Sequence, residues 1–110
     1  MEPNSNILKE IYHQIQDRSV NPKEKSYTNY LLDEGIDKIC KKVGEEATET
    51  VIAAKNTNKE ELIGEISDLT YHVLVLMFKS GVNLEDVENK LIERHKKEGN
   101  KKEKNQRGEY

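Results

Sequence analysis

The sequence has 110 residues, which is the length of one domain, and 34% of it is hydrophobic whereas 35% is charged. The formal net charge of −3 argues against non-specific nucleic-acid binding, because such binding draws on a positive surface. So small an apolar fraction gives one copy a thin core, and small domains commonly complete their burial by oligomerisation. We therefore expect a homodimer or a higher homo-oligomer.

The expected compartment is the cytoplasm. The single cysteine, Cys40, excludes an internal disulfide and fits a reducing environment. The N-terminal segment lacks the basic stretch and apolar stretch of a signal peptide. The longest nearly apolar run, Leu69 to Phe78, is too short to span a bilayer. The sequence predicts a soluble cytoplasmic protein with no membrane partner.

The first half of the chain predicts two helices before a long third one. Apolar residues at helical spacing predict a helix from about Ser5 to Arg18, with Ser5 as its cap: Ile7, Leu8, Ile11 and Ile15. Asn21-Pro22 ends this helix and opens a polar linker. A short helix is predicted over Tyr27 to Glu34, and Gly35 stops it.

A long helix is predicted from Ile36 to the break at 56–58, and Cys40 falls on its apolar stripe, where we expect it to be buried. The next helix starts at Asn58, which forms a capping box with Glu61, and ends at Gly81. Its inward-facing residues are expected to be Leu62, Ile66, Leu69, Val73 and Leu76.

A last helix is predicted from Leu84 to about Lys97, with Val87, Leu91 and Ile92 facing inward. The segment 98–110 has no apolar periodicity and is predicted to be a disordered charged tail. No window has a strand pattern. The expected fold is a single all-α domain over 1–97, an up-and-down helical bundle.

Two pairs of acidic residues carry the strongest chemical signal in the sequence. Glu46 and Glu49 share one helix face, and Glu65 and Asp68 share another, each pair at the edge of an apolar stripe. If these two helices pack side by side, four carboxylates meet at one place. Oxygen ligands of this kind suit Mg²⁺, or Mn²⁺ as the alternative.

Spacing alone does not distinguish a metal site from solvated helix faces. With 21 acidic residues, pairs three apart are expected roughly four times by chance. The chain holds four such pairs: Glu34/Asp37, Glu46/Glu49, Glu65/Asp68 and Glu85/Glu88. No Walker A, GxGxxG, HExxH or CxxC motif is present to support another chemistry.

Five further residues are candidates for binding a substrate. Lys42, Lys38 and Lys55 flank the acidic pairs and are able to hold phosphate oxygens as point charges, although solvent-facing lysines paired with glutamates are the alternative. His72 lies one turn beyond Asp68, which suits a general base, a substrate contact or a packed histidine. Tyr27 is either a helix-start residue or a substrate contact.

Three segments of this sequence resemble a known enzyme family. They are KKVGEEATE at Lys41–Glu49, IAAK at Ile52–Lys55 and DLTYHVLVLM at Asp68–Met77. Together they closely resemble the phosphoribosyl-ATP pyrophosphatase family, whose enzymes catalyse the second step of histidine biosynthesis, and the similarity covers about Ile7 to His95. The wider relatives are the all-α nucleotide pyrophosphatases of the MazG type, which share an ExxE…ExxD pattern.

The resemblance implies a homodimeric bundle that hydrolyses phosphoribosyl-ATP to phosphoribosyl-AMP and pyrophosphate. It implies Mg²⁺-assisted attack of water on the α–β phosphoanhydride, with the catalytic and metal-binding residues at Glu46, Glu49, Glu65 and Asp68. Lys42, with Lys38 or Lys55, would stabilise the leaving group. Gly64 departs from the family pattern, because many members carry an acid there.

Two other functions fit the same residues. One is a MazG-like house-cleaning nucleoside triphosphate pyrophosphatase, which would use the same carboxylates on a different substrate. The other is a non-catalytic helical dimerisation module, in which the acids are solvated faces.

Overall fold

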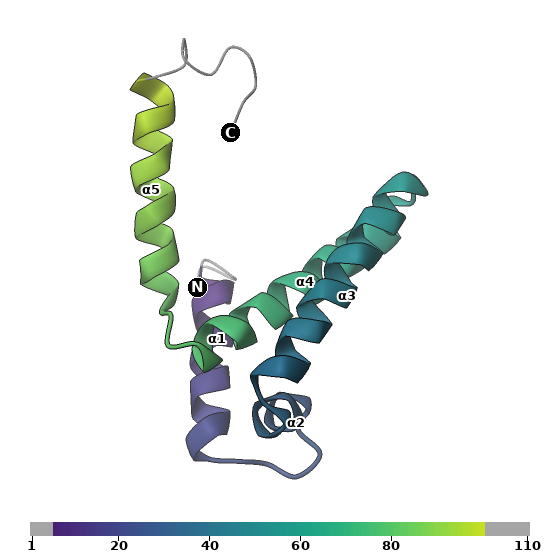
Figure 1. The fold of residues 1–110 in the computed structure, drawn as a ribbon, viewed down its shortest axis with the longest axis vertical. Helices are drawn as coiled ribbons and strands as arrows, with labels where there is room; N and C mark the ends of the chain where they lie inside the picture. The colour runs from purple at the N-terminus through teal and green to yellow at the C-terminus, as the bar shows by residue number, and fades with distance from the viewer. Residues whose placement is uncertain (1–5, 101–110) are drawn as a thin grey trace.

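The computed structural model describes residues 6–100 and their side chains as far as residue 98. Five helices and no strand occupy this part of the chain (Figure 1): α1 (Ile7–Val20), α2 (Tyr27–Glu34), α3 (Ile36–Lys55), α4 (Lys59–Lys79) and α5 (Leu84–Asn100). The predicted all-α fold is therefore confirmed. The expected cap Ser5 and residues 101–110 of the expected tail lie outside the described residues, whereas 98–100 belong to α5.

Local sequence signals account for where the helices begin and end. Ser26 and Asn58 each accept a hydrogen bond from the backbone N–H three residues further on, at 3.1 and 3.0 Å, which caps α2 and α4. Gly35 separates α2 from α3 with a φ of 97°, and Gly81 follows α4 with a φ of 76°. Glycine adopts these positive φ values without a Cβ clash, so both glycines stop a helix at a fixed point.

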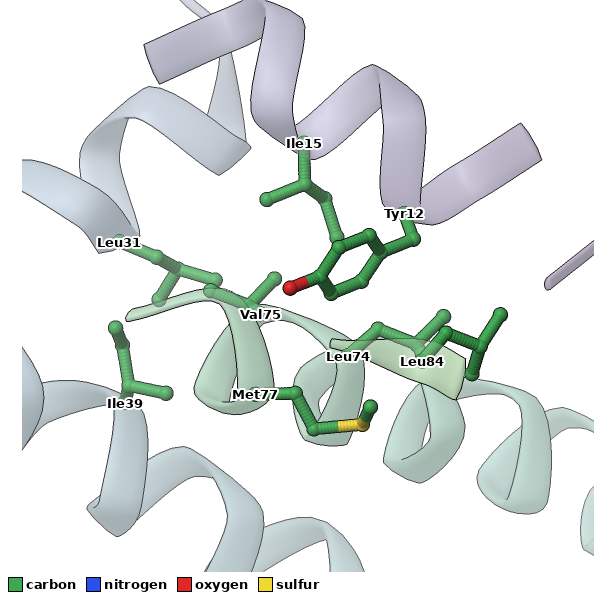
Figure 2. Packing of buried hydrophobic residues seen from close by; sticks show 8 residues of the cluster. All are labelled: Tyr12, Ile15, Leu31, Ile39, Leu74, Val75, Met77 and Leu84. Carbon is green, nitrogen blue, oxygen red and sulfur yellow. The ribbon is translucent and has the colours of Figure 1, made fainter. Parts of the chain in front are cut away.

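The antiparallel pair formed by α3 and α4 is the largest helix–helix contact, and the other helices gather at one end of it (Figure 1). There α1 packs on α4, and α2 packs on α1, α3 and α4. Figure 2 shows the core at this junction, with buried side chains from α1 to α4 and one from the start of α5: Tyr12, Ile15, Leu31, Ile39, Leu74, Val75, Met77 and Leu84. This core fixes α2 against the end of the α3–α4 pair.

The last helix departs from the compact packing that the sequence predicts. Helix α5 projects away from the α3–α4 pair and makes few contacts with the other helices (Figure 1). Leu91 and Ile92, expected to face inward, are 61% and 53% exposed, although Leu84 is buried and Val87 is half-buried. None of the described helices combines the length and the apolar character that a membrane span requires.

Cys40 was expected to be buried, and that prediction is wrong because its side chain is exposed. The neighbouring Ile39 is the residue of α3 that enters the core, where it is fully buried. One residue along a helix rotates the side chain by about 100°, since a turn takes 3.6 residues. Only one of these two neighbours therefore faces the junction of α1, α2 and α4.

Candidate metal centre

Helices α3 and α4 bring three of the four predicted carboxylates together. One oxygen from each of Glu46, Glu49 and Glu65 lies within 4.8 Å of the other two. Glu46 is buried, Glu65 is half-buried and Glu49 is exposed, so the group reaches from the helix–helix contact to solvent. The arrangement is a small oxygen-lined site that is open on one side.

Two of these carboxylates each have one buried oxygen without a partner. Among the described side chains, Oε1 of Glu46 and Oε1 of Glu65 are the buried polar atoms that have no hydrogen-bond partner. Leaving a buried charged oxygen unsatisfied costs more than leaving a neutral one, so such atoms need a cation or a proton. Carboxylate oxygens are the ligands that Mg²⁺ and Mn²⁺ prefer, and the residues present therefore fit a divalent cation.

The pKa of Glu65 reflects the crowding of these acidic side chains. Burial, followed by a hydrogen bond and charge repulsion from Glu49, raises the pKa of Glu65 from 4.5 to about 7, with smaller contributions from Glu46 and Asp68. Asp68 itself is exposed and lies outside the group of three. Its negative charge acts on Glu65 all the same, so Asp68 stands at the edge of the site.

His72 lies one turn beyond Asp68 on α4 and is buried, with 5% of its surface exposed. Its Nδ1 is 2.7 Å from the carbonyl oxygen of Asp68, and its Nε2 is 2.8 Å from the hydroxyl of Tyr27. Both ring nitrogens are therefore occupied. Of the roles open to His72 in the sequence, a packed, hydrogen-bonded residue that orients its neighbours agrees best with this geometry.

The three candidate lysines lie at different places along α3. Lys42, one turn before Glu46, pairs with Glu45 at 3.5 Å, and the adjacent phenol of Tyr27 raises the pKa of the Lys42 ammonium. Lys38 lies a further turn towards α2. Lys55 is in the last turn, about 25 Å along the helix from Lys38 at 1.5 Å per residue. Lys38 and Lys55 thus flank the carboxylates from opposite ends.

A row of tyrosines beside the carboxylates is a feature that the sequence analysis missed. The ring of Tyr27 is nearly parallel to that of Tyr30, with centroids 6.0 Å apart, and to that of Tyr71, with centroids 6.3 Å apart. The hydroxyls of Tyr71 and Thr28 are hydrogen-bonded to each other. The available signal was the spacing of Tyr27 and Tyr30, because residues three apart share a helix face.

Comparison with known proteins identifies a family for this chain. The model of the phosphoribosyl-ATP pyrophosphohydrolase family matches residues 8–95, which include every carboxylate and aromatic residue described above. The chain belongs to the phosphoribosyl-ATP pyrophosphohydrolase family. The resemblance noted in the sequence is thereby confirmed, and the chain is a member of a family of hydrolases.

Two kinds of relative match this family member. The phosphoribosyl-ATP pyrophosphatases of Clostridium novyi and Clostridium acetobutylicum are 58% and 56% identical to it; the alignments cover 90% and 87% of this chain and the same shares of those proteins. The histidine biosynthesis bifunctional protein HisIE of Lactococcus lactis is 62% identical over 90% of this chain. The chain spans only 47% of that bifunctional protein.

Proposed function

We propose that this chain hydrolyses phosphoribosyl-ATP to phosphoribosyl-AMP and pyrophosphate, the second step of histidine biosynthesis. The single observation that carries the proposal is the carboxylate group between α3 and α4, in which two buried oxygens lack partners. Family membership and the names of the Clostridium relatives support the choice of substrate. We also propose a cytoplasmic location, in keeping with a biosynthetic enzyme.

The proposed cofactor is Mg²⁺, with Mn²⁺ as the alternative. Glu46 and Glu65 would hold it through their unpartnered oxygens, with Glu49 as a third ligand and Asp68 at the edge of the site. When bound, Mg²⁺ would offset the charge of the triphosphate oxygens and orient the α–β linkage. Burial and the neighbouring acidic charges, which together raise the pKa of Glu65, are the reason why this group of acids favours a cation.

The remaining chemistry falls to residues with access to solvent. Glu49 is the exposed member of the group, so it is the carboxylate placed to accept a proton from the attacking water. Lys42 lies one turn before Glu46 and would stabilise the charge of the leaving pyrophosphate. Lys38 and Lys55 lie too far apart to bind the same phosphate, so at most one of them shares this role with Lys42.

The test is a measurement of pyrophosphate release with Mg²⁺ from phosphoribosyl-ATP, from ATP and from a panel of nucleoside triphosphates. We expect the highest kcat/KM with phosphoribosyl-ATP. A preference for a non-canonical nucleoside triphosphate would indicate the MazG-like house-cleaning function instead. Release from none of them would leave the non-catalytic dimerisation module.

Amide variants test the assignment of the carboxylates. We expect turnover to fall by more than about 100-fold in each of E46Q, E49Q, E65Q and D68N. Replacing a residue that only hydrogen-bonds to a metal ligand commonly lowers metal affinity or activity 10- to 100-fold. E85Q/E88Q is the matched control, since this pair has the same spacing but lies on α5. The control should keep wild-type activity, and circular dichroism should show unchanged helicity in all variants.

We further propose that the functional unit is a homodimer. A groove of about 250 Å³ runs between α1 and α4, and its apolar walls include Ile7, Leu8 and Ile66, each more than 40% exposed. The exposed Leu91 and Ile92 of α5 are a second apolar surface. Surfaces of this kind on a thin-cored chain are typical of faces that a second copy covers.

A further inference from the structure

Tyr30 and Tyr27 present a half-exposed aromatic surface beside the carboxylate group. The two residues are 46% and 44% exposed, and the planes of their rings are inclined by only 23°. We propose that this surface binds the adenine ring of the substrate, and that Tyr30 selects an adenine that carries a positive charge. The inference deepens the proposed function and rests on it, because it takes phosphoribosyl-ATP as the substrate.

The aromatic surface is held rigidly in place. The hydroxyl of Tyr27 is 2.8 Å from Nε2 of the buried His72, which also packs edge-on against the same ring with a centroid distance of 5.6 Å. Tyr71 lies nearly parallel to Tyr27 on α4. Because Tyr27 is fixed from α4, the ring of Tyr30 stacks on an immobile neighbour, and little conformational entropy is lost when a base stacks there.

Hydrogen bonds also link this surface to the edge of the carboxylate group. The hydroxyl of Tyr27 is 2.8 Å from Nε2 of His72, and Nδ1 of His72 is 2.7 Å from the carbonyl oxygen of Asp68, so one hydrogen-bonded residue separates this ring from the edge of the candidate metal centre. Tyr30 lies one turn further along α2 from Tyr27. A nucleotide with its phosphates at the carboxylates is therefore able to place its base on the tyrosine row.

Tyr30 already holds a cation. The Nζ of Lys38 lies 5.7 Å from the centroid of the Tyr30 ring, which is the geometry of a cation–π contact, and a hydrogen bond to Tyr30 raises the pKa of Lys38. A lysine ammonium is strongly hydrated and sits on a flexible stem, so a ligand displaces it easily. The displaced Lys38 would then be free to pair with a phosphate.

The substrate supplies a cation of the right shape. In phosphoribosyl-ATP the second ribose is bonded to N1 of adenine, and alkylation at N1 makes the ring so basic that it is largely protonated near neutral pH. The adenine of ATP is neutral there. A protonated purine gains both stacking and cation–π attraction on a tyrosine face, whereas a neutral purine gains stacking alone. Tyr30 would therefore favour phosphoribosyl-ATP over ATP.

The test compares two isomeric ligands, N1-methyl-AMP, whose base is cationic, and N6-methyl-AMP, whose base is neutral. Calorimetry on the wild-type protein should give a dissociation constant about 5- to 10-fold lower for the N1 isomer, in the range of partly exposed cation–π contacts. Y30L should lose this preference, and Y30F, which keeps the ring face, should retain it. Equal affinities of the wild-type protein for the two isomers would overturn the proposal.

A spectroscopic measurement on a second variant tests the same contact even if Y30L does not fold. The chain contains no tryptophan, so Y30W introduces a single reporter at the proposed contact. N1-methyl-AMP should quench its fluorescence, and N6-methyl-AMP at the same concentration should quench it less. If saturating N1-methyl-AMP leaves the fluorescence of Y30W unchanged, no base stacks at position 30.

Turnover separates this inference from the proposed function. In Y30L the KM for phosphoribosyl-ATP should rise about 10- to 100-fold with kcat nearly unchanged, because the lost stacking is ground-state binding that the transition state shares. If the wild-type enzyme releases pyrophosphate and Y30L has the same KM as the wild type, the role of Tyr30 is refuted and the proposed function stands. A wild-type protein that releases none would refute the proposed function, and the comparison of methyl isomers would still decide whether the tyrosines bind a cationic base.

Discussion

The hydroxyl of Tyr27 lies 2.8 Å from Nε2 of His72 and joins the first residue of α2 to the middle of α4. The other ring nitrogen, Nδ1, is 2.7 Å from the carbonyl oxygen of Asp68. A carbonyl only accepts, so Nδ1 carries the proton, and in the neutral ring Nε2 accepts the hydrogen bond that Tyr27 donates. His72 thereby links an edge residue of the carboxylate site to the tyrosine row.

The first prediction concerns this hydrogen bond. Y27F should lower the free energy of unfolding by about 1–3 kcal/mol, because it leaves Nε2 of the buried His72 without a partner. Urea denaturation at constant m-value measures the change. Y30F is the matched control and should change stability by less than about 0.5 kcal/mol, since Tyr30 is half-exposed.

A double-mutant cycle isolates the contribution of the Tyr27–His72 pair. In Y27F/H72L both polar partners are gone, so the combined loss should fall short of the sum of the single losses by about 0.5–3 kcal/mol. Strictly additive losses would show that the two side chains do not interact in solution.

The sequence predicted the helices well because their signals are local. Caps at Asn58, the glycine stops and the apolar periodicity each act within a few residues, and α2 was predicted with its observed bounds, Tyr27–Glu34. The exposure of Cys40 and Leu91 was not predictable in this way. Which side of an apolar stripe meets a partner depends on how helices cross, and that is a property of the whole chain.

The candidate site was predicted in part for a related reason. Spacing and family motifs selected Glu46, Glu49 and Glu65, which the fold does bring together. The motif also included Asp68, which the structure places at the edge of the group. Tyr30 was missed because its role depends on Lys38 of α3 and on Tyr27, whose own partners Tyr71 and His72 come from α4, and no local pattern reveals such contacts.

The second prediction concerns Mg²⁺ and stability. If Mg²⁺ binds the native carboxylate group and not the unfolded chain, as proposed, then at 100 times its dissociation constant it should stabilise the protein by about 2.7 kcal/mol. For a domain of this size that corresponds to a rise in Tm of about 10 °C. Differential scanning fluorimetry with and without Mg²⁺ should show the rise in the wild type and in E85Q/E88Q. A rise of the same size in E46Q would place the ion elsewhere.

The third prediction concerns pH in the absence of metal. Burial and the hydrogen bond and charge of Glu49 raise the pKa of Glu65 in the folded state to about 7, against 4.5 in the unfolded chain. Between these values Glu65 binds more protons in the folded state than in the unfolded state, so its contribution to stability falls as the pH rises through this window. In EDTA, Tm should therefore be lower above pH 7 than near pH 4.5.

Replacing Glu65 separates its contribution from that of other titrating groups. E65Q has no proton to lose, so the decline of Tm with rising pH should be smaller in E65Q than in the wild type under the same conditions. Saturating Mg²⁺ should also reduce the decline in the wild type, because the cation replaces the proton as the partner of the carboxylates. An identical decline in E65Q and the wild type would assign the pH dependence to other groups.

The fourth prediction concerns the proposed homodimer. Leu91 lies on the apolar side of α5 and is 61% exposed in the single chain. A glutamate at this position would have its unpaired charge buried by a second copy, and that burial opposes dimerisation. Light scattering after size exclusion should give twice the chain mass for the wild type and the mass of one chain for L91E. N89E, on the opposite face of the same helix, should remain dimeric. A dimeric L91E would move the interface from α5 to another surface, of which the groove between α1 and α4 is the next to test.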